Sequence, residues 1–259
     1  MWGAIIGDIV GSIYEWSPIK TKEFEFLKDE CTYTDDSVCT TAVAEIILDN
    51  LPAAPAMQQW CRDHPGRGYG GMFRVWIKHP NPEPYHSYGN GAAMRVSPAA
   101  FLNRNRPLEE ALTAANCVTK ITHNHPEGMK GARATTHAIW LAFQEYEPEH
   151  IRGTIECEYG YDLSRTVDEI RPEYSFNETC QGTVPEAITC ALESTSFEDA
   201  VRNAVSLGGD ADTLAAIAGP IAEAMHGIPH DLMAKAKGSH LAEAPDIVKV
   251  MARMYETAV

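Results

Sequence analysis

The chain has 259 residues, of which 44% are hydrophobic, so it can bury a substantial core without disulfide bonds. It carries 21 basic and 36 acidic residues, which gives a formal net charge of −15. This charge argues against nonspecific binding to nucleic acid or to an anionic membrane, because both need a basic surface.

The N-terminal segment and the cysteines indicate a cytoplasmic protein. Residues 1–8 carry no basic leader, and Asp8 interrupts their apolar run, so we expect neither a signal peptide nor a membrane span. The seven cysteines include no Cys-x-x-Cys pair and are expected to be reduced thiols. Cys39, Cys117 and Cys190 lie within apolar helical patterns and are expected in the core.

Helical patterns recur along most of the chain. Thr34 is expected to cap a helix whose first turn holds Asp35 and Asp36. Farther along, Ser196 and Asp199 resemble a capping box. Apolar residues follow helical spacing in four segments: Val38–Leu48, Leu108–Val118, Ala132–Phe143 and Thr213–Met225.

Signals for strands and domain linkers are few. Phe24–Leu27 and Thr154–Tyr159 are weak strand candidates. The Pro-rich segments Leu51–Pro55 and His79–Pro84 are expected to be loops, and neither is long enough for a flexible linker. We therefore predict one compact all-α domain over residues 1–259.

Two acidic clusters lie far apart in the chain, each at an expected helix start. Each pairs two carboxylates with a threonine hydroxyl: Thr34, Asp35 and Asp36 in the first, and Asp210, Asp212 and Thr213 in the second. If both are brought together, four carboxylates repel one another unless a cation lies among them. Oxygen ligands of this kind suit Mg²⁺, Mn²⁺ or Ca²⁺ rather than Zn²⁺. The alternative is that both clusters are solvated helix caps.

Flexible backbone accompanies these clusters. The pair Gly208-Gly209 permits backbone angles that turn Asp210 and Asp212 toward one site. The glycine-rich segment 86–91 is expected to be a loop whose backbone N–H groups and Ser87 hydroxyl bind a diphosphate, with Tyr88 stacking on a base or ribose. The alternative for this segment is an ordinary tight turn.

Two other motifs carry less information. Gly66–Gly71 satisfies G-x-G-x-x-G, but no apolar strand precedes it, so we reject a dinucleotide-binding fold and allow only that it lines the same cleft. His123 and His125 form a His-x-His sequence without further ligands at zinc spacing. The chain has no Gly-x-Ser-x-Gly nucleophile motif and no basic groove for a polynucleotide.

Taken in order, four motifs resemble the ADP-ribosylglycohydrolase family. They are Gly3–Ser12, Thr34–Ser37, Gly89–Arg95 and Gly208–Thr213, and they extend over nearly the whole chain. The resemblance implies an all-helical domain with a central cleft that holds two Mg²⁺ or Mn²⁺ ions. The ligands that it implies are Thr34, Asp35, Asp36, Asp210, Asp212 and Thr213. It also places segment 87–91 (Ser87, Tyr88, Gly89, Asn90 and Gly91) on the ADP-ribose diphosphate and His123 at the substrate.

The implied reaction is hydrolysis of the bond between ADP-ribose and an acceptor, which is a protein side chain, a small molecule such as O-acetyl-ADP-ribose, or a nucleic-acid end. Asp36 is the candidate for positioning or deprotonating the water. Ile13-Tyr14-Glu15 resembles the segment that supplies a mobile glutamate in relatives that cleave serine-linked ADP-ribose, so Glu15 is the second catalytic candidate and O-linked substrates are favoured. Three alternatives stay open: arginine N-linked substrates, a non-catalytic crystallin-like protein on the same scaffold, and a dimetal hydrolase of another phosphorylated metabolite.

Overall fold

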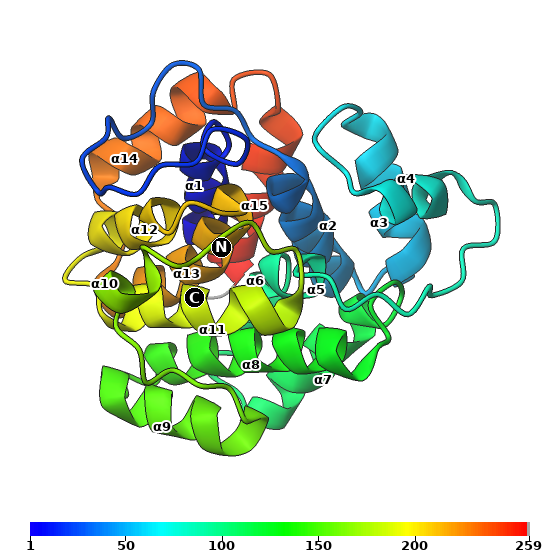
Figure 1. Cartoon of the computed structure of the whole chain (residues 1–259). Helices are drawn as coiled ribbons and strands as arrows, with labels where there is room; N and C mark the ends of the chain where they lie inside the picture. The colour runs from blue at the N-terminus through cyan, green and yellow to red at the C-terminus, as the bar shows by residue number, and fades with distance from the viewer. Residues whose placement is uncertain (258–259) are drawn as a thin grey trace.

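The computed structural model describes residues 1–257, and they form helices and loops only (Figure 1). No β-strand occurs in this range, and one isolated antiparallel bridge joins Gly89 and Thr179. The prediction of a single compact all-α domain is confirmed. In chain order the helices are α1 (Trp2–Gly11), α2 (Asp35–Asp49), α3 (Ala53–Asp63), α4 (Gly71–Lys78), α5 (Gly91–Met94), α6 (Ser97–Leu102), α7 (Leu108–Thr119), α8 (Pro126–Phe143), α9 (Pro148–Tyr159), α10 (Val167–Ile170), α11 (Cys180–Leu192), α12 (Phe197–Ser206), α13 (Ala211–His226), α14 (His230–Lys235), the π-helical turn η1 (Ala236–His240) and α15 (Pro245–Thr257).

The four helices expected from apolar periodicity are present as α2, α7, α8 and α13. Thr34 caps α2 as predicted, because its hydroxyl accepts the N–H of Asp36 at 3.3 Å. Ser196 caps α12 by accepting the N–H of Asp199 at 3.1 Å. The Asp199 carboxylate bonds the N–H of Thr195 instead of returning to Ser196, so only half of the expected capping box forms.

Three local expectations were wrong. Thr154–Tyr159 is the end of α9, which begins at Pro148 and stops at Gly160 in the left-handed conformation, and its apolar Ile151 and Ile155 are buried one turn apart. Phe24–Leu27 is loop. Leu51–Pro55 is only partly loop, because α3 begins at Ala53 immediately after Pro52.

The cysteines follow the prediction with one exception. All seven are free thiols, but Cys117 is exposed on α7 rather than buried in the core. Separately, none of the helices in residues 1–257 has the length and apolarity needed to cross a bilayer.

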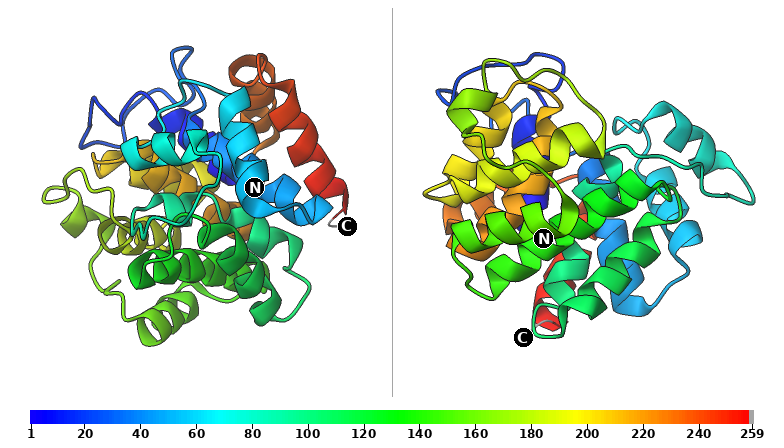
Figure 2. Two further views of the ribbon diagram at one scale, coloured as in Figure 1. Left: turned by 90° about the vertical axis from the view of Figure 1, so that its right-hand side faces the viewer. Right: turned by 60° about the horizontal axis from the view of Figure 1, so that its bottom comes forward.

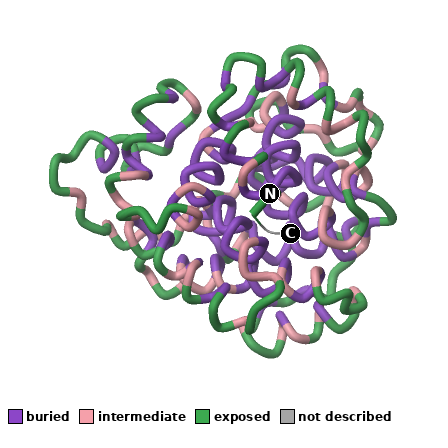
Figure 3. The backbone as a smooth tube through the Cα atoms, turned by 180° about the vertical axis from the view of Figure 1, so that it is seen from behind, coloured by how far each residue is buried: buried purple, intermediate pink, exposed green. Residues whose placement is uncertain are grey.

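The core is built around α1 and α13. Every residue of α1 is buried, and α1 packs along α13, with α11 and α12 also against α13. Gly7 makes this approach possible, because a Cβ atom there would lie 2.5 Å from the carbonyl carbon of Ala215. Buried residues fill the centre of the molecule and exposed ones surround it (Figure 3), while α3 and α4 lie at one side (Figures 1 and 2).

Candidate active site

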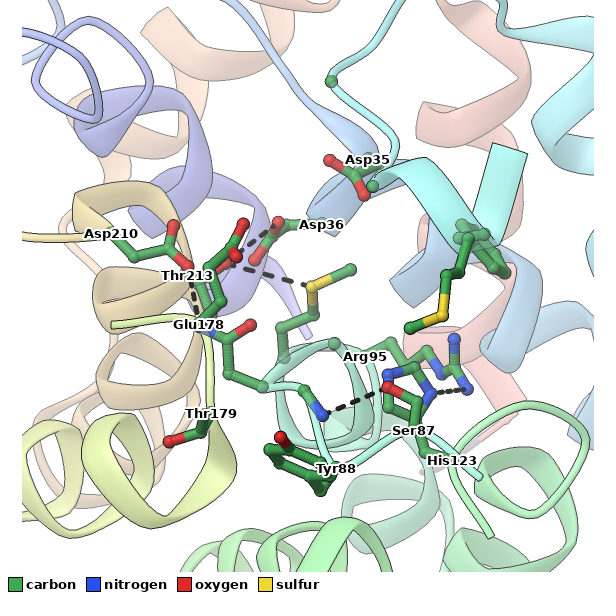
Figure 4. Close-up of a pocket in the computed structure, with 18 of the residues that line it drawn as sticks. Asp35, Asp36, Ser87, Tyr88, Arg95, His123, Glu178, Thr179, Asp210 and Thr213 are labelled. Atoms are coloured by element: carbon green, nitrogen blue, oxygen red, sulfur yellow. Dashed lines mark hydrogen bonds between the residues drawn. The ribbon is translucent and has the colours of Figure 1, made fainter. Parts of the chain in front are cut away.

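A pocket of about 410 Å³ opens where the N-termini of α2 and α13 meet the loop before α5. It brings together segments from widely separated parts of the chain (Figure 4). Every site residue expected from the sequence lines this pocket except Thr34, whose hydroxyl lies behind it against Asp8 and Asp36.

The carboxylates form two overlapping groups at one end of the pocket. Oxygen atoms of Asp8, Asp36 and Asp212 lie within 4.8 Å of one another, as do those of Glu15, Asp210 and Asp212. Asp212 belongs to both groups, so the two candidate cation positions are adjacent. Asp35 also lines the pocket but belongs to neither group.

Asp8, which the sequence analysis did not assign to the site, ties α1 to the start of α2. Its carboxylate accepts the N–H groups of Thr34 at 2.9 Å and Ser37 at 3.0 Å, and the Thr34 hydroxyl at 2.6 Å. The Ser37 hydroxyl donates to it as well. Through these bonds Asp8 holds the start of α2 and positions Asp36, in addition to its place in the first carboxylate group. The feature of the sequence that could have identified Asp8 as a site residue is its charge inside an otherwise apolar helix.

Electrostatics in this cluster favour a cation. Burial raises the pKa of Asp8, Asp35, Asp36 and Asp212, and for Asp36 the neighbouring charges of Asp212 and Asp8 raise the pKa further. One oxygen of Asp36, Oδ1, is buried without a hydrogen-bond partner. An unpartnered carboxylate oxygen among other carboxylates is a suitable ligand for a hard divalent cation such as Mg²⁺ or Mn²⁺.

Glu15 lies in the turn that follows α1. Beside it, Tyr14 is buried and packs on the Phe24 ring at 5.1 Å between centroids, which anchors the turn. The pKa of Glu15 is raised to about 7, first by burial and then by the charge of Asp212. Without a bound cation, a carboxyl group with this pKa exchanges a proton readily at neutral pH.

Asp210 is held by a residue that the sequence analysis assigned to the substrate. The Asn90 side-chain amide donates to Asp210 at 2.6 Å and to the Thr183 hydroxyl at 3.2 Å. Gly208, with φ of +65°, provides the left-handed turn that leads into Asp210. The Asn90 amide therefore orients a carboxylate of the cluster.

The loop before α5 offers fewer free donors than the sequence suggested. The N–H of Asn90 bonds the Glu178 carbonyl at 2.8 Å, and the N–H of Gly89 bonds Ser87 Oγ at 3.1 Å. Glu178 itself lines the pocket, and nothing in the sequence identified it. Tyr88 is 47% exposed at the rim, with His125 at 5.1 Å between ring centroids.

His123 is neutral and carries its proton on Nε2. The Arg95 guanidinium, which can only donate, lies 3.3 Å from Nδ1 and also donates to the Thr122 hydroxyl at 2.6 Å. That hydroxyl is 2.7 Å from the same Nδ1, so Nδ1 is an acceptor. Burial and the Arg95 charge hold the pKa of His123 well below its usual value. The Nε2–H group lies beside Gly89 and Gly91, where it can donate to an anionic ligand.

The Gly66–Gly71 loop lines the pocket through Gly68, Gly70 and Gly71. It follows α3 rather than a strand, which confirms the rejection of a dinucleotide-binding fold. The loop also supports the metal-ligand candidates, because the Arg67 carbonyl accepts the N–H of Asp35 at 2.7 Å.

Comparison with known proteins agrees with this geometry. The family model described as ADP-ribosylglycohydrolase matches residues 1–257. The chain is 26% identical to ADP-ribosylhydrolase ARH3 from Bos taurus, over 87% of this chain and 83% of that protein. It is 25% identical to ADP-ribosylarginine hydrolase Tri1 from Pseudomonas putida, over 87% and 69%.

A solved structure described as an ADP-ribosylglycohydrolase-related protein complex superposes with a TM-score of 0.75 at 22% identity, over 100% of this chain and 96% of that one, and it shows the same fold. Because the family model covers the whole of the described chain, the protein belongs to the ADP-ribosylglycohydrolase family and is a hydrolase that acts on glycosyl bonds.

Proposed function

We propose that the protein hydrolyses the bond between ADP-ribose and an acceptor with the help of two Mg²⁺ or Mn²⁺ ions, and that it prefers O-linked substrates. The observation that carries the proposal is the pair of overlapping carboxylate groups that share Asp212 at one end of the pocket. Residues 1–259 act as one unit in this proposal, and the protein works in the cytoplasm. Its substrate is an ADP-ribosylated protein or small molecule.

Each residue has a stated task. Asp36, Asp210 and Asp212 hold the cations, with Asp35, Thr34 and Thr213 beside them. The Ser87 hydroxyl and the Nε2–H of His123 bind the diphosphate with the backbone of Gly89 and Gly91, and Tyr88 stacks on the base. When bound, the cations supply positive charge that orients the ribose hydroxyls and a water.

The reaction replaces one C–O bond by another through an oxocarbenium-like transition state. Water attacks the anomeric carbon, the bond to the acceptor oxygen breaks, and that oxygen takes up a proton. Asp36 is placed to accept the proton from water. Glu15, whose carboxylate lies within 4.8 Å of oxygens of Asp210 and Asp212, is placed to protonate the acceptor oxygen.

The test supplies serine-linked and arginine-linked ADP-ribosyl peptides and O-acetyl-ADP-ribose with Mg²⁺, Mn²⁺ or a chelator, and measures released ADP-ribose. We expect metal-dependent release that is faster from O-linked substrates. Asp212→Asn and Glu15→Gln should each lower kcat by about 100-fold or more, while Asp231→Asn, on the exposed start of α14, should not. Full turnover by Asp212→Asn, or in chelator, would refute the proposal.

A further inference from the structure

Two exposed aromatic side chains, Trp16 and Phe176, stack on each other close in sequence to residues that line the pocket. Trp16 is 76% exposed and Phe176 is 41% exposed, with ring centroids 5.4 Å apart and planes 28° apart. Trp16 follows Glu15 and Phe176 precedes Glu178 by two residues, and both glutamates line the pocket. Trp16 thus contributes little to the core, and an exposed aromatic pair beside a pocket is typical of an interaction site.

Contacts of neighbouring tyrosines hold the two loop segments that carry Trp16 and Phe176. On one side, buried Tyr14 fixes the turn that carries Trp16. On the other, the Tyr174 hydroxyl donates to the Gly182 carbonyl at 2.9 Å, and its ring fills the space where a side chain at Gly209 would lie. The backbone segments that carry the two rings are therefore held in place by buried or hydrogen-bonded neighbours.

The position of the pair relates it to one end of the substrate. Glu15 reaches the carboxylate end of the pocket, whereas Tyr88 and His125 lie together at the rim, next to the loop before α5. If the ribose is bound by the carboxylates and the diphosphate by that loop, the anomeric carbon faces the end where Glu15 lies. The acceptor then leaves the pocket past Trp16 and Phe176.

Charge identifies the kind of acceptor that fits. Glu15 and Glu178 line the pocket beside the pair, Glu173 is exposed on the same loop as Phe176, and the chain carries a net charge of −15. The two cations nearest in sequence to the pair already have partners: Lys20 donates to the carbonyls of residues 171 and 174, and Arg171 pairs with Asp168. A tryptophan face among carboxylates attracts an ammonium or guanidinium group.

We propose that Trp16 and Phe176 bind the acceptor polypeptide through a lysine or arginine next to the ADP-ribosylated residue. This inference rests on the proposed function and adds the acceptor class to it. The pair discriminates between acceptors and takes no part in bond cleavage.

The experiment compares serine-linked ADP-ribosyl peptides that differ only in flanking residues, with lysine or with serine beside the modified position, and includes O-acetyl-ADP-ribose. The measured quantity is the ratio of kcat/KM for the basic peptide to that for the neutral one. We expect a ratio of about 3 to 10 in the unmodified protein. Trp16→Ala and Phe176→Ala should bring it close to one. Tyr146→Ala, which alters another exposed aromatic residue stacked on a neighbour, His150, should leave the ratio unchanged.

The ratio is informative even where Trp16→Ala disturbs Glu15, because that disturbance slows both peptides equally. The inference is overturned if the unmodified protein hydrolyses both peptides with a kcat/KM ratio of one, or if both variants keep the ratio of the unmodified protein. In either case hydrolysis of O-acetyl-ADP-ribose leaves the proposed function standing. No release of ADP-ribose from any substrate overturns the proposed function instead. If the pair mediates self-association, size-exclusion chromatography will show a dimer that Phe176→Ala dissociates with no change in the ratio, which also overturns the inference.

Discussion

Replacing Gly7 by alanine tests whether the contact between α1 and α13 sets the geometry of the metal site. The new Cβ would lie 2.5 Å from the carbonyl carbon of Ala215 and 3.0 Å from the backbone nitrogen of Ala216. Carbon atoms in good contact are about 3.5–4.0 Å apart, so the helices must separate by about 1 Å. The obstructing atoms belong to the backbone, and no side-chain rotation can relieve the overlap.

Overpacking of a core typically costs about 1–3 kcal/mol, and this site falls at the upper end because the neighbour is rigid. The better helix propensity of alanine offsets about 1 kcal/mol. We therefore expect a net loss of about 2 kcal/mol in the free energy of unfolding, or about 4–8 °C in Tm. Because Asp8 follows Gly7 on α1 and Asp212 lies on α13, affinity for Mg²⁺ or Mn²⁺ should fall as well.

Gly153→Ala is the matched control. Gly153 lies in the interior of α9, is exposed, and has no atom within 4 Å of its added Cβ. Here alanine should stabilise the protein by about 0.5–1 kcal/mol and leave metal affinity unchanged. Denaturant unfolding and calorimetric metal titration of both variants provide the measurement. A Gly7→Ala protein as stable as Gly153→Ala, with unaltered metal affinity, would refute the argument.

Three further predictions concern the site itself. The metal-free protein should lose stability as pH rises from about 4 to 7, because carboxylates whose pKa is raised on folding bind protons more tightly in the folded state. The pKa of Asp210 is raised from 3.8 to about 6, so this residue alone accounts for a loss of about 3 kcal/mol in the free energy of unfolding. Thermal unfolding across this range should show the decline and its reversal by Mg²⁺, and an apo protein more stable at pH 7 than at pH 5 would contradict it. Asn90→Ala removes the 2.6 Å bond to Asp210 and should weaken metal binding about 10-fold or more, as measured by calorimetry; equal affinity would show that Asp210 needs no support. Arg95→Met removes one of the two groups at His123 Nδ1 and the charge that, after burial, lowers the pKa of His123. The pKa of His123 should therefore rise, although burial still holds it below the usual value of about 6.5, and binding of ADP-ribose should become tighter as pH falls below that value. The unmodified protein should show a weaker dependence, and a flat profile in the variant would exclude this role.

Much of the fold follows from local sequence. Apolar spacing and the cap at Thr34 place the helices that carry both acidic clusters, and these signals act within a few residues of the chain. Thr154–Tyr159 misleads because its β-branched and aromatic residues favour a strand, while Pro148 and Gly160, which bound α9, lie outside that segment. The sequence predicts a helix boundary most accurately where the capping residue lies beside the apolar pattern.

The supporting contacts of the site could not be predicted from local sequence. Asp8 bonds residues 26 and 29 positions away, Asn90 bonds Asp210 at a separation of 120 residues, and Arg95 meets His123 across 28 residues. No periodicity or spacing rule encodes such pairings, because they arise when helices pack. Only a polar residue inside an apolar run, as at Asp8, signals from sequence that a buried partner exists.

The two parts of the pocket therefore depend on different kinds of structure. Asp36 and Asp212 lie in the first turns of α2 and α13, and α1 fixes these helices through Asp8 and through the glycine contact at Ala215. Glu15, Trp16 and Phe176 lie on loops that are anchored only at neighbouring residues. Helix termini hold a ligand set to the narrow tolerance that cation binding requires, whereas loops accept substitution at little cost to the core. A change of acceptor preference should thus be obtainable by altering residues 16–17 and 175–176, which hold none of the carboxylates of the cluster, while metal affinity stays constant.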